Sequence, residues 1–90
     1  MNERQQITIE ILERNGFKFE DGYFKWFSAD NDSYYFGYES AHVDLRNGYM
    51  YVTKEYSDGK TKCVRGNPFG YVDELQSALT LCGIDKTILV

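Results

Sequence analysis

The sequence predicts a single α+β domain in which an N-terminal and a C-terminal helix pack on one face of an antiparallel sheet of four or five strands. Helical spacing of apolar residues is confined to the two ends of the chain, whereas the middle alternates with the period of a strand. Asn-Gly and Asp-Gly pairs, which favour tight hairpin turns, separate the alternating segments. The 90 residues leave room for one modest core, so we expect residues 1–90 to form one domain.

The first helix is expected from about Asn2 to Asn15. Asn2 is a suitable N-cap, and Gln5 stands three residues later in the capping-box position. Gly16 supplies the left-handed residue that commonly ends a helix. Residues 7–11 also alternate like a strand, and we choose the helix because of the length of the segment and its Asn-Gly stop.

The following segments read as strands separated by turns. Asp21-Gly22 predicts a tight turn between the first two strands, and Asn67-Pro68 ends the sheet because proline cannot donate to a ladder. The expected strands are residues 17–20, 23–27, 34–38, 42–46, 49–56 and 60–65.

Two hairpin registers follow from the requirement that one face be apolar. A two-residue turn at Asn47-Gly48 would pair Arg46 with Tyr49, Asp44 with Tyr51 and His42 with Thr53. The opposite face would then carry an apolar set that must face the core, formed by Val43, Leu45, Met50 and Val52.

The second hairpin turn is expected to have three residues. A two-residue turn at Asp58-Gly59 would place Val52 opposite Arg65, whereas a turn at 57–59 with a bulge at Gly59 places Val52 opposite Val64. We prefer the bulged turn because it keeps the core face apolar.

The second helix is expected from about Tyr71 to Cys82. Its apolar residues form one stripe, made of Val72, Leu75, Ala78, Leu79 and Cys82. Gly83 should end the helix, with Ile84 folding back in a Schellman-type contact. The apolar residues 87–90 are either an additional edge strand or part of an interface, and the sequence leaves this choice open.

Two helices can cover only one face of such a sheet, so the other face should stay open. We expect that open face to carry His42, Asp44, Arg46, Tyr49, Tyr51, Thr53 and Glu55. The candidate binding residues are Arg46, Tyr49 and Tyr51, with Arg65 on the neighbouring strand. Tyr and Arg are enriched in interface hot spots, and both can stack on bases. The alternative explanation for these tyrosines is that Tyr is common in half-exposed strands whether or not they bind a partner. The predicted function is therefore a non-enzymatic module for protein interaction or self-association, with a protein partner or a homodimer.

Charge and cysteine content restrict the environment and the partners. The acidic chain, with a net charge of -4, argues against nucleic-acid or membrane binding driven by overall charge. No apolar run approaches the roughly 20 residues of a membrane-spanning helix, and the polar segment 1–6 does not resemble a signal peptide. Cys63 and Cys82 lack metal-ligand spacing and are expected to be free, buried thiols in a reducing compartment, so a cytoplasmic location is expected.

The sequence contains no recognisable catalytic or metal-binding arrangement. Its one histidine, His42, is interpreted as a residue of the open sheet face rather than a catalytic base. Asp30-Asn31-Asp32 lacks the glycine and the terminal glutamate of an EF-hand loop at the proper offsets, and is interpreted as a turn. No cofactor is expected, and a small-molecule pocket between helices and sheet leaves no trace in the sequence.

Two resemblances supply an alternative function. The order of a helix, strands and a helix is similar to that of double-stranded RNA-binding domains, although residues 72–76 are acidic where those domains are basic. Residues 11–17 and 75–84 are similar to the helix ends of HicA-type toxins, which are small ribonucleases, but their catalytic Gly-Ser-His segment has no match here. The alternative is therefore a nucleic-acid-binding protein or ribonuclease, whose RNA contacts would come from Arg46, Lys54, Lys60, Lys62 and Arg65.

Overall fold

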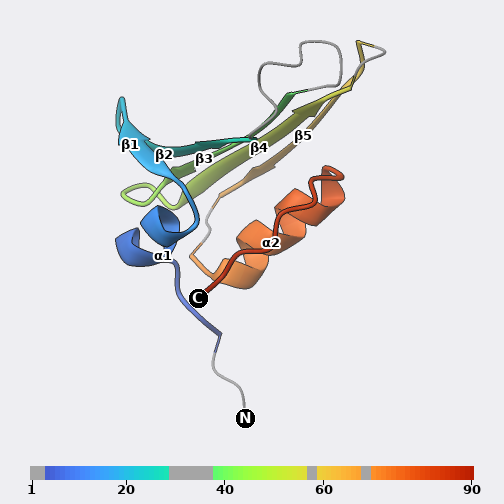
Figure 1. Ribbon diagram of the computed structural model, residues 1–90. Helices are drawn as coiled ribbons and strands as arrows, with labels where there is room; N and C mark the ends of the chain where they lie inside the picture. Colours follow the sequence, from blue (N-terminus) through green and yellow to red (C-terminus); the bar gives the residue numbers. More distant parts are fainter. Residues whose placement is uncertain (1–3, 29–37, 57–58, 68–69) are drawn as a thin grey trace.

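The computed structural model describes residues 4–28, 38–56, 59–67 and 70–90 (Figure 1). Five antiparallel strands follow one another in the order β1-β2-β3-β4-β5, and both helices lie on the same side of this sheet (Figure 1). The predicted fold class is confirmed. The elements are α1 (Ile9–Arg14), β1 (Lys18–Glu20), β2 (Tyr23–Phe27), β3 (Tyr38–Asp44), β4 (Tyr49–Glu55), β5 (Thr61–Gly66) and α2 (Val72–Leu81).

The core lies between the helices and one face of the sheet. Alternate strand residues point into it, because successive side chains of a strand face opposite sides. Its most deeply buried members come from both layers: Leu12 from α1, Ala41 and Val43 from β3, Val52 from β4, Leu75 and Leu79 from α2, and Cys82.

The first helix begins at Ile9, so the prediction that it begins at about Asn2 is wrong: residues 4–8 are described and are not helical. Asn2 itself lies outside the described residues. Thr8 is the N-cap, and its Oγ1 accepts a hydrogen bond of 3.2 Å from the amide of the third helical residue. The preceding chain is extended instead, and Gln6 forms a β-bridge with Tyr71 ahead of α2. This pairing satisfies backbone groups that a longer helix would have used. Gly16, at φ +86°, ends the helix as expected.

The register of β3 with β4 differs from the prediction by two residues. Asp44 pairs with Tyr49 and His42 with Tyr51, which leaves residues 45–48 as the loop. The Asp44 carboxylate explains the wider loop, because it accepts hydrogen bonds from the Arg46 amide (3.0 Å), the Asn47 amide (3.2 Å) and the Asn47 side chain (2.7 Å). A shift of two residues keeps every strand side chain on its predicted face.

The same shift moves two predicted strand residues into the loop. β3 runs from Tyr38 to Asp44 rather than over 42–46, so Leu45 packs against the core from the loop and Arg46 leaves the open face. The expected strand over 34–38 falls mainly on residues 34–37, which lie outside the described residues.

The β4–β5 register is confirmed. Val52 pairs with Val64, and the Tyr56 amide donates a 2.7 Å hydrogen bond to the Lys60 carbonyl on either side of the predicted turn at 57–59. Gly59 has φ +85°, the left-handed conformation that glycine adopts without strain. The other two turn residues lie outside the described residues.

The second helix agrees with its prediction except for one residue at each end. Glu74 caps its N-terminus by accepting a 2.9 Å hydrogen bond from the Tyr71 amide. Gly83 has φ +77°, and the Ile84 amide donates to the Leu79 carbonyl at 2.9 Å, which is the predicted Schellman closure.

Residues 87–90 do not form a strand but pack along the core, and we call them the strap. Figure 1 shows this segment running back past α2 toward α1. Ile88 is buried, and its amide donates to the Gln76 side chain at 2.8 Å. The Asn15 side chain donates to the Leu89 carbonyl at 2.7 Å and accepts from the Leu89 amide at 2.8 Å. Two buried or half-buried amide side chains therefore fix the strap.

The two cysteines occupy different environments. Cys82 is buried as expected, and burial raises the pKa of its thiol. Cys63 is exposed, which corrects the prediction of two buried thiols, because it alternates with the core-packed Val64 on β5 and so faces the open side. Among the described residues, no helix is both long and apolar enough to cross a membrane.

Candidate functional site

The open face of the sheet gathers aromatic and cationic side chains from four strands. Strand pairing aligns Lys25, His42, Tyr51 and Arg65 in one row across β2, β3, β4 and β5. Further aromatic side chains flank this row on β2 and β4. We call this set the open-face cluster, and its members are Tyr23, Lys25, Phe27, His42, Tyr49, Tyr51 and Arg65.

His42 is the centre of the cluster. Its ring lies nearly parallel to that of Tyr51, at an interplanar angle of 10° and with the ring centroids 6.0 Å apart. Phe27 meets His42 edge-on with centroids 5.9 Å apart, and Tyr23 lies at 6.4 Å. Arg65 completes the row with its Cζ 5.0 Å from the centre of the Tyr51 ring, within the range of a cation–π contact. Ring contacts therefore connect five of the seven members of the cluster, namely Tyr23, Phe27, His42, Tyr51 and Arg65.

Burial and a neighbouring charge both favour the neutral form of the histidine in the cluster. Burial lowers the pKa of His42 below its usual value, and the nearby Lys25 ammonium lowers it further. The pKa of Arg65 is raised by the Tyr51 hydroxyl and by the Cys63 thiol. At neutral pH the cluster thus presents an uncharged imidazole in the row between Lys25 and Arg65.

The cluster surrounds a shallow hollow in the sheet surface. Six residues of the open side line it together with Asp21, and its volume is about 480 Å³. The Lys25 ammonium lies 3.5 Å from the Asp21 carboxylate and 3.9 Å from that of Glu20, and both carboxylates are exposed, so each of these ion pairs contributes little free energy. Most other polar groups around the hollow can donate hydrogen bonds, namely the tyrosine hydroxyls and the Arg65 guanidinium. A ligand rich in acceptors, with an apolar part for the rings, suits this surface.

Three of the four predicted binding residues belong to the cluster. Tyr49, Tyr51 and Arg65 lie around the same hollow, whereas Arg46 lines a different one on the helix side of the sheet. The sequence analysis did not include the contributions of β2, chiefly Tyr23. The alternation within residues 23–27 places these side chains on one face, but the neighbour of β2 could not be deduced across residues 28–37.

The cations of the RNA-binding alternative do not share one surface. Only Arg65 belongs to the open-face cluster. Lys54 is 2.8 Å from the Glu39 carboxylate on the helix side, and Lys62 alternates with Arg65 on β5 and therefore faces the opposite side. Arg46 lines the separate hollow. This dispersion gives a nucleic-acid backbone no continuous cationic track among these residues.

The cluster lacks the usual components of a catalytic centre in the part of the chain that the structure describes. The ring contacts of His42 are with Tyr23, Phe27 and Tyr51. The described residues contain no group of three or more His, Cys, Asp or Glu side chains that could hold a metal ion.

Comparison with known proteins adds no family. No protein-family model matches the chain, and searches of curated proteins and of solved structures find no significant match.

Proposed function

We propose that this chain is a protein-interaction module, and that its open-face cluster binds a short peptide segment that combines one or two carboxylates with an aromatic or aliphatic side chain. The observation that carries the proposal is the row Lys25, His42, Tyr51 and Arg65, in which ring contacts join the last three residues, on a sheet face that no described helix or strand covers (Figure 1).

The exposure of the cluster supports a role in contact. Tyr23 and Phe27 are 37% and 38% exposed, and Arg65 is exposed as well. His42, Tyr49 and Tyr51 are half-buried, so their rings are held in place while one surface remains accessible. Tyrosine loses little conformational entropy on binding, and both tyrosine and arginine are enriched in interface hot spots.

The charges of the cluster indicate the chemistry of the segment. Lys25 and Arg65 flank the rings, so a carboxylate can pair with a cation while an apolar side chain lies on His42 and Tyr51. The net charge of -4 disfavours a polyanion, because its many charges would be repelled by the whole domain. A segment with few carboxylates gains the local attraction without that repulsion.

Selection from a displayed library of random peptides tests the proposal. The wild-type domain should enrich peptides that pair Asp or Glu with an aromatic or aliphatic residue. A synthetic peptide from that pool should bind roughly tenfold or more weakly to Tyr51→Ala and to Arg65→Ala, as expected for hot-spot residues. Arg14→Ala is the matched control, since Arg14 is an exposed residue of α1, and it should bind like the wild type.

Three results decide between the possible partners. A pool without enrichment, or a peptide that binds both cluster variants as well as the wild type, would contradict the proposal. RNA retained at low salt and lost in Arg65→Ala would favour the nucleic-acid alternative instead. Light scattering across a dilution series tests self-association: a dimer that Tyr49→Ala and Tyr51→Ala dissociate would identify a second copy of this chain as the protein partner.

A further inference from the structure

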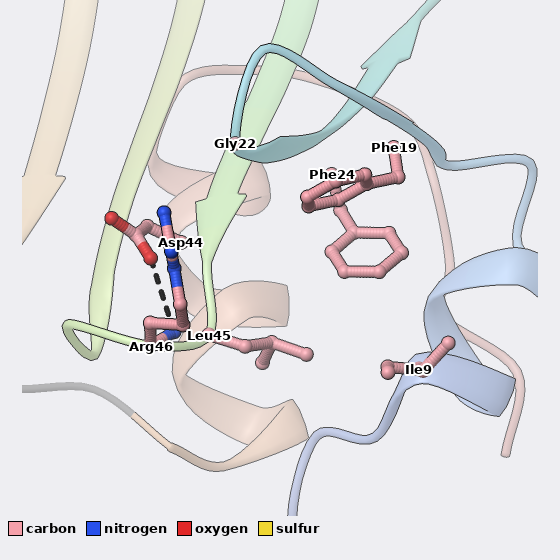
Figure 2. A pocket seen from close by; sticks show the side chains of 7 residues that line it. All are labelled: Ile9, Phe19, Gly22, Phe24, Asp44, Leu45 and Arg46. Carbon is pink, nitrogen blue, oxygen red and sulfur yellow. Dashed lines mark hydrogen bonds between the residues drawn. The ribbon is translucent and has the colours of Figure 1, made fainter.

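A second hollow lies on the helix side of the sheet, beside the short helix α1. It has a volume of about 350 Å³, and Ile9, Phe19, Gly22, Phe24, Asp44, Leu45 and Arg46 line it (Figure 2). α1 contains six residues, and it leaves side chains at the β1 end of the sheet exposed. The hollow is on the opposite side of the sheet from the open-face cluster, so its occupant would be independent of the partner proposed above.

The walls of this hollow are apolar. The Phe19 and Phe24 rings are tilted against each other with their centroids 5.0 Å apart. Ile9 and Leu45 project toward each other from α1 and from the β3–β4 loop (Figure 2). Ile9 and Phe19 remain 53% and 64% exposed. A ligand that buried these surfaces would gain hydrophobic free energy in proportion to the area removed from water.

One cation stands at the edge of the apolar walls. Asp44 fixes the loop that carries Arg46, because its carboxylate accepts the Arg46 amide at 3.0 Å. The Arg46 side chain extends toward Gly22, where a Cβ atom would lie 3.5 Å from the guanidinium nitrogen Nη2 (Figure 2). The oxygens of Asp44 are occupied by the loop, chiefly by Asn47, whose side-chain hydrogen bond lowers the pKa of Asp44, and the nearby Arg46 charge lowers that pKa further. None of the ion pairs among the described residues includes Arg46.

We propose that this hollow binds a small amphipathic monocarboxylate, with its apolar body between Ile9, Phe19 and Leu45 and its carboxylate on the Arg46 guanidinium. The volume is at the lower end of the range for small-molecule sites, which suits an alkyl or aryl body of modest size. A guanidinium can hold a carboxylate through two parallel hydrogen bonds, so a single arginine is sufficient to orient such a ligand.

Amide-resolved NMR titration with sodium octanoate tests the proposal, with 1-octanol and octylammonium as matched ligands of the same chain length. Octanoate should shift the amide signals of residues 9, 19, 22, 24, 45 and 46 and leave those of Tyr51 and Arg65, in the open-face cluster, unchanged. Octanol should bind about three- to tenfold more weakly, because it retains the apolar contact and loses the charge-assisted hydrogen bonds. Octylammonium should bind more weakly still.

Variants at two positions separate the contributions of charge and of apolar contact. Arg46→Gln should reduce octanoate affinity to that of octanol, and Arg46→Glu should reverse the preference toward octylammonium; Arg14→Gln is the control and should bind like the wild type. Ile9→Ser should weaken octanoate and octanol alike. Ile9 and Arg46 are both exposed, so variants at these positions should fold. Equal binding of octanoate and octanol to the wild type, shifts centred on other residues, or no saturable binding would overturn the proposal.

Discussion

The two faces of the same strands differ in what they contribute to the molecule. On β4, Val52 is fully buried under the helices, while its neighbour Tyr51 is half-buried on the open side and stacks on His42. The covered face supplies the apolar area that folding requires. The open face supplies ring contacts between cross-strand pairs, and each such pair contributes only modestly to the free energy of folding. The comparison teaches that core packing and the open-face contacts can be altered separately in this domain by choosing even or odd positions of one strand.

The largest expected effect is on the covered face. Leu79 is completely buried in α2, and Leu79→Ala should reduce the free energy of unfolding by about 2–5 kcal/mol, through lost burial and a residual cavity. Urea unfolding followed by circular dichroism measures this change. Leu81→Ala on the same helix is the control, because Leu81 is 59% exposed and its truncation should cost less than about 0.5 kcal/mol. Similar losses for the two variants would contradict the assignment of the core face.

The strap over the core gives the next effect. The Asn15 side chain donates to the Ile11 and Leu89 carbonyls and accepts from the Leu89 amide. Asn15→Ala should therefore cost about 1–3 kcal/mol, since the part-buried Leu89 amide and carbonyl lose their partners. Hydrogen exchange should accelerate first at the Leu89 amide. Unchanged exchange at that amide would show that the strap is held by other contacts.

Adjacent substitutions on β4 sharpen the comparison of the two faces. Tyr51→Ala should reduce the free energy of unfolding by no more than about 1 kcal/mol, the range of a cross-strand pair. Val52→Ala, one position further, should cost more because it creates a cavity in the core. A stability loss for Tyr51→Ala that equals that of Val52→Ala would place the open face within the folding core.

A small pH effect is expected from the open face. The pKa of His42 is lowered in the folded protein, so the unfolded chain takes up a proton first as the pH falls below the ordinary value of 6.5. The His42 contribution to stability is therefore unchanged above that pH, and declines between that value and the lower folded pKa. Urea unfolding from about pH 7 to about pH 5 should show this decline, and His42→Phe should remove it. The same slope in both proteins would mean that other groups cause it.

Local sequence signals predicted most of the fold. Gly16 and Gly83 end the helices where left-handed residues were expected. Val52 pairs with Val64 as predicted, because that register keeps the core face apolar. The failures have long-range causes. The start of α1 depends on a bridge between Gln6 and Tyr71, which are far apart in the sequence.

The candidate site was predictable only in part. Alternation placed Tyr49, Tyr51 and Arg65 on one face, and that parity survived the two-residue error in register. Arg46 was assigned to the same face because the hydrogen bonds of the Asp44 side chain, which widen the loop, were not anticipated. The apolar hollow had no sequence signature, because it depends on where α1 begins relative to the β1–β2 hairpin.

Solvent paramagnetic relaxation tests most directly whether the open-face cluster is available for contact. In a dilute monomeric sample, a dissolved gadolinium chelate should relax the ring protons of Tyr51 and Tyr23 strongly and leave the methyl protons of Val52 protected. Tyr51 and Tyr23 rings as protected as Val52 within a single copy would mean that the chain covers this face itself, and would contradict the account.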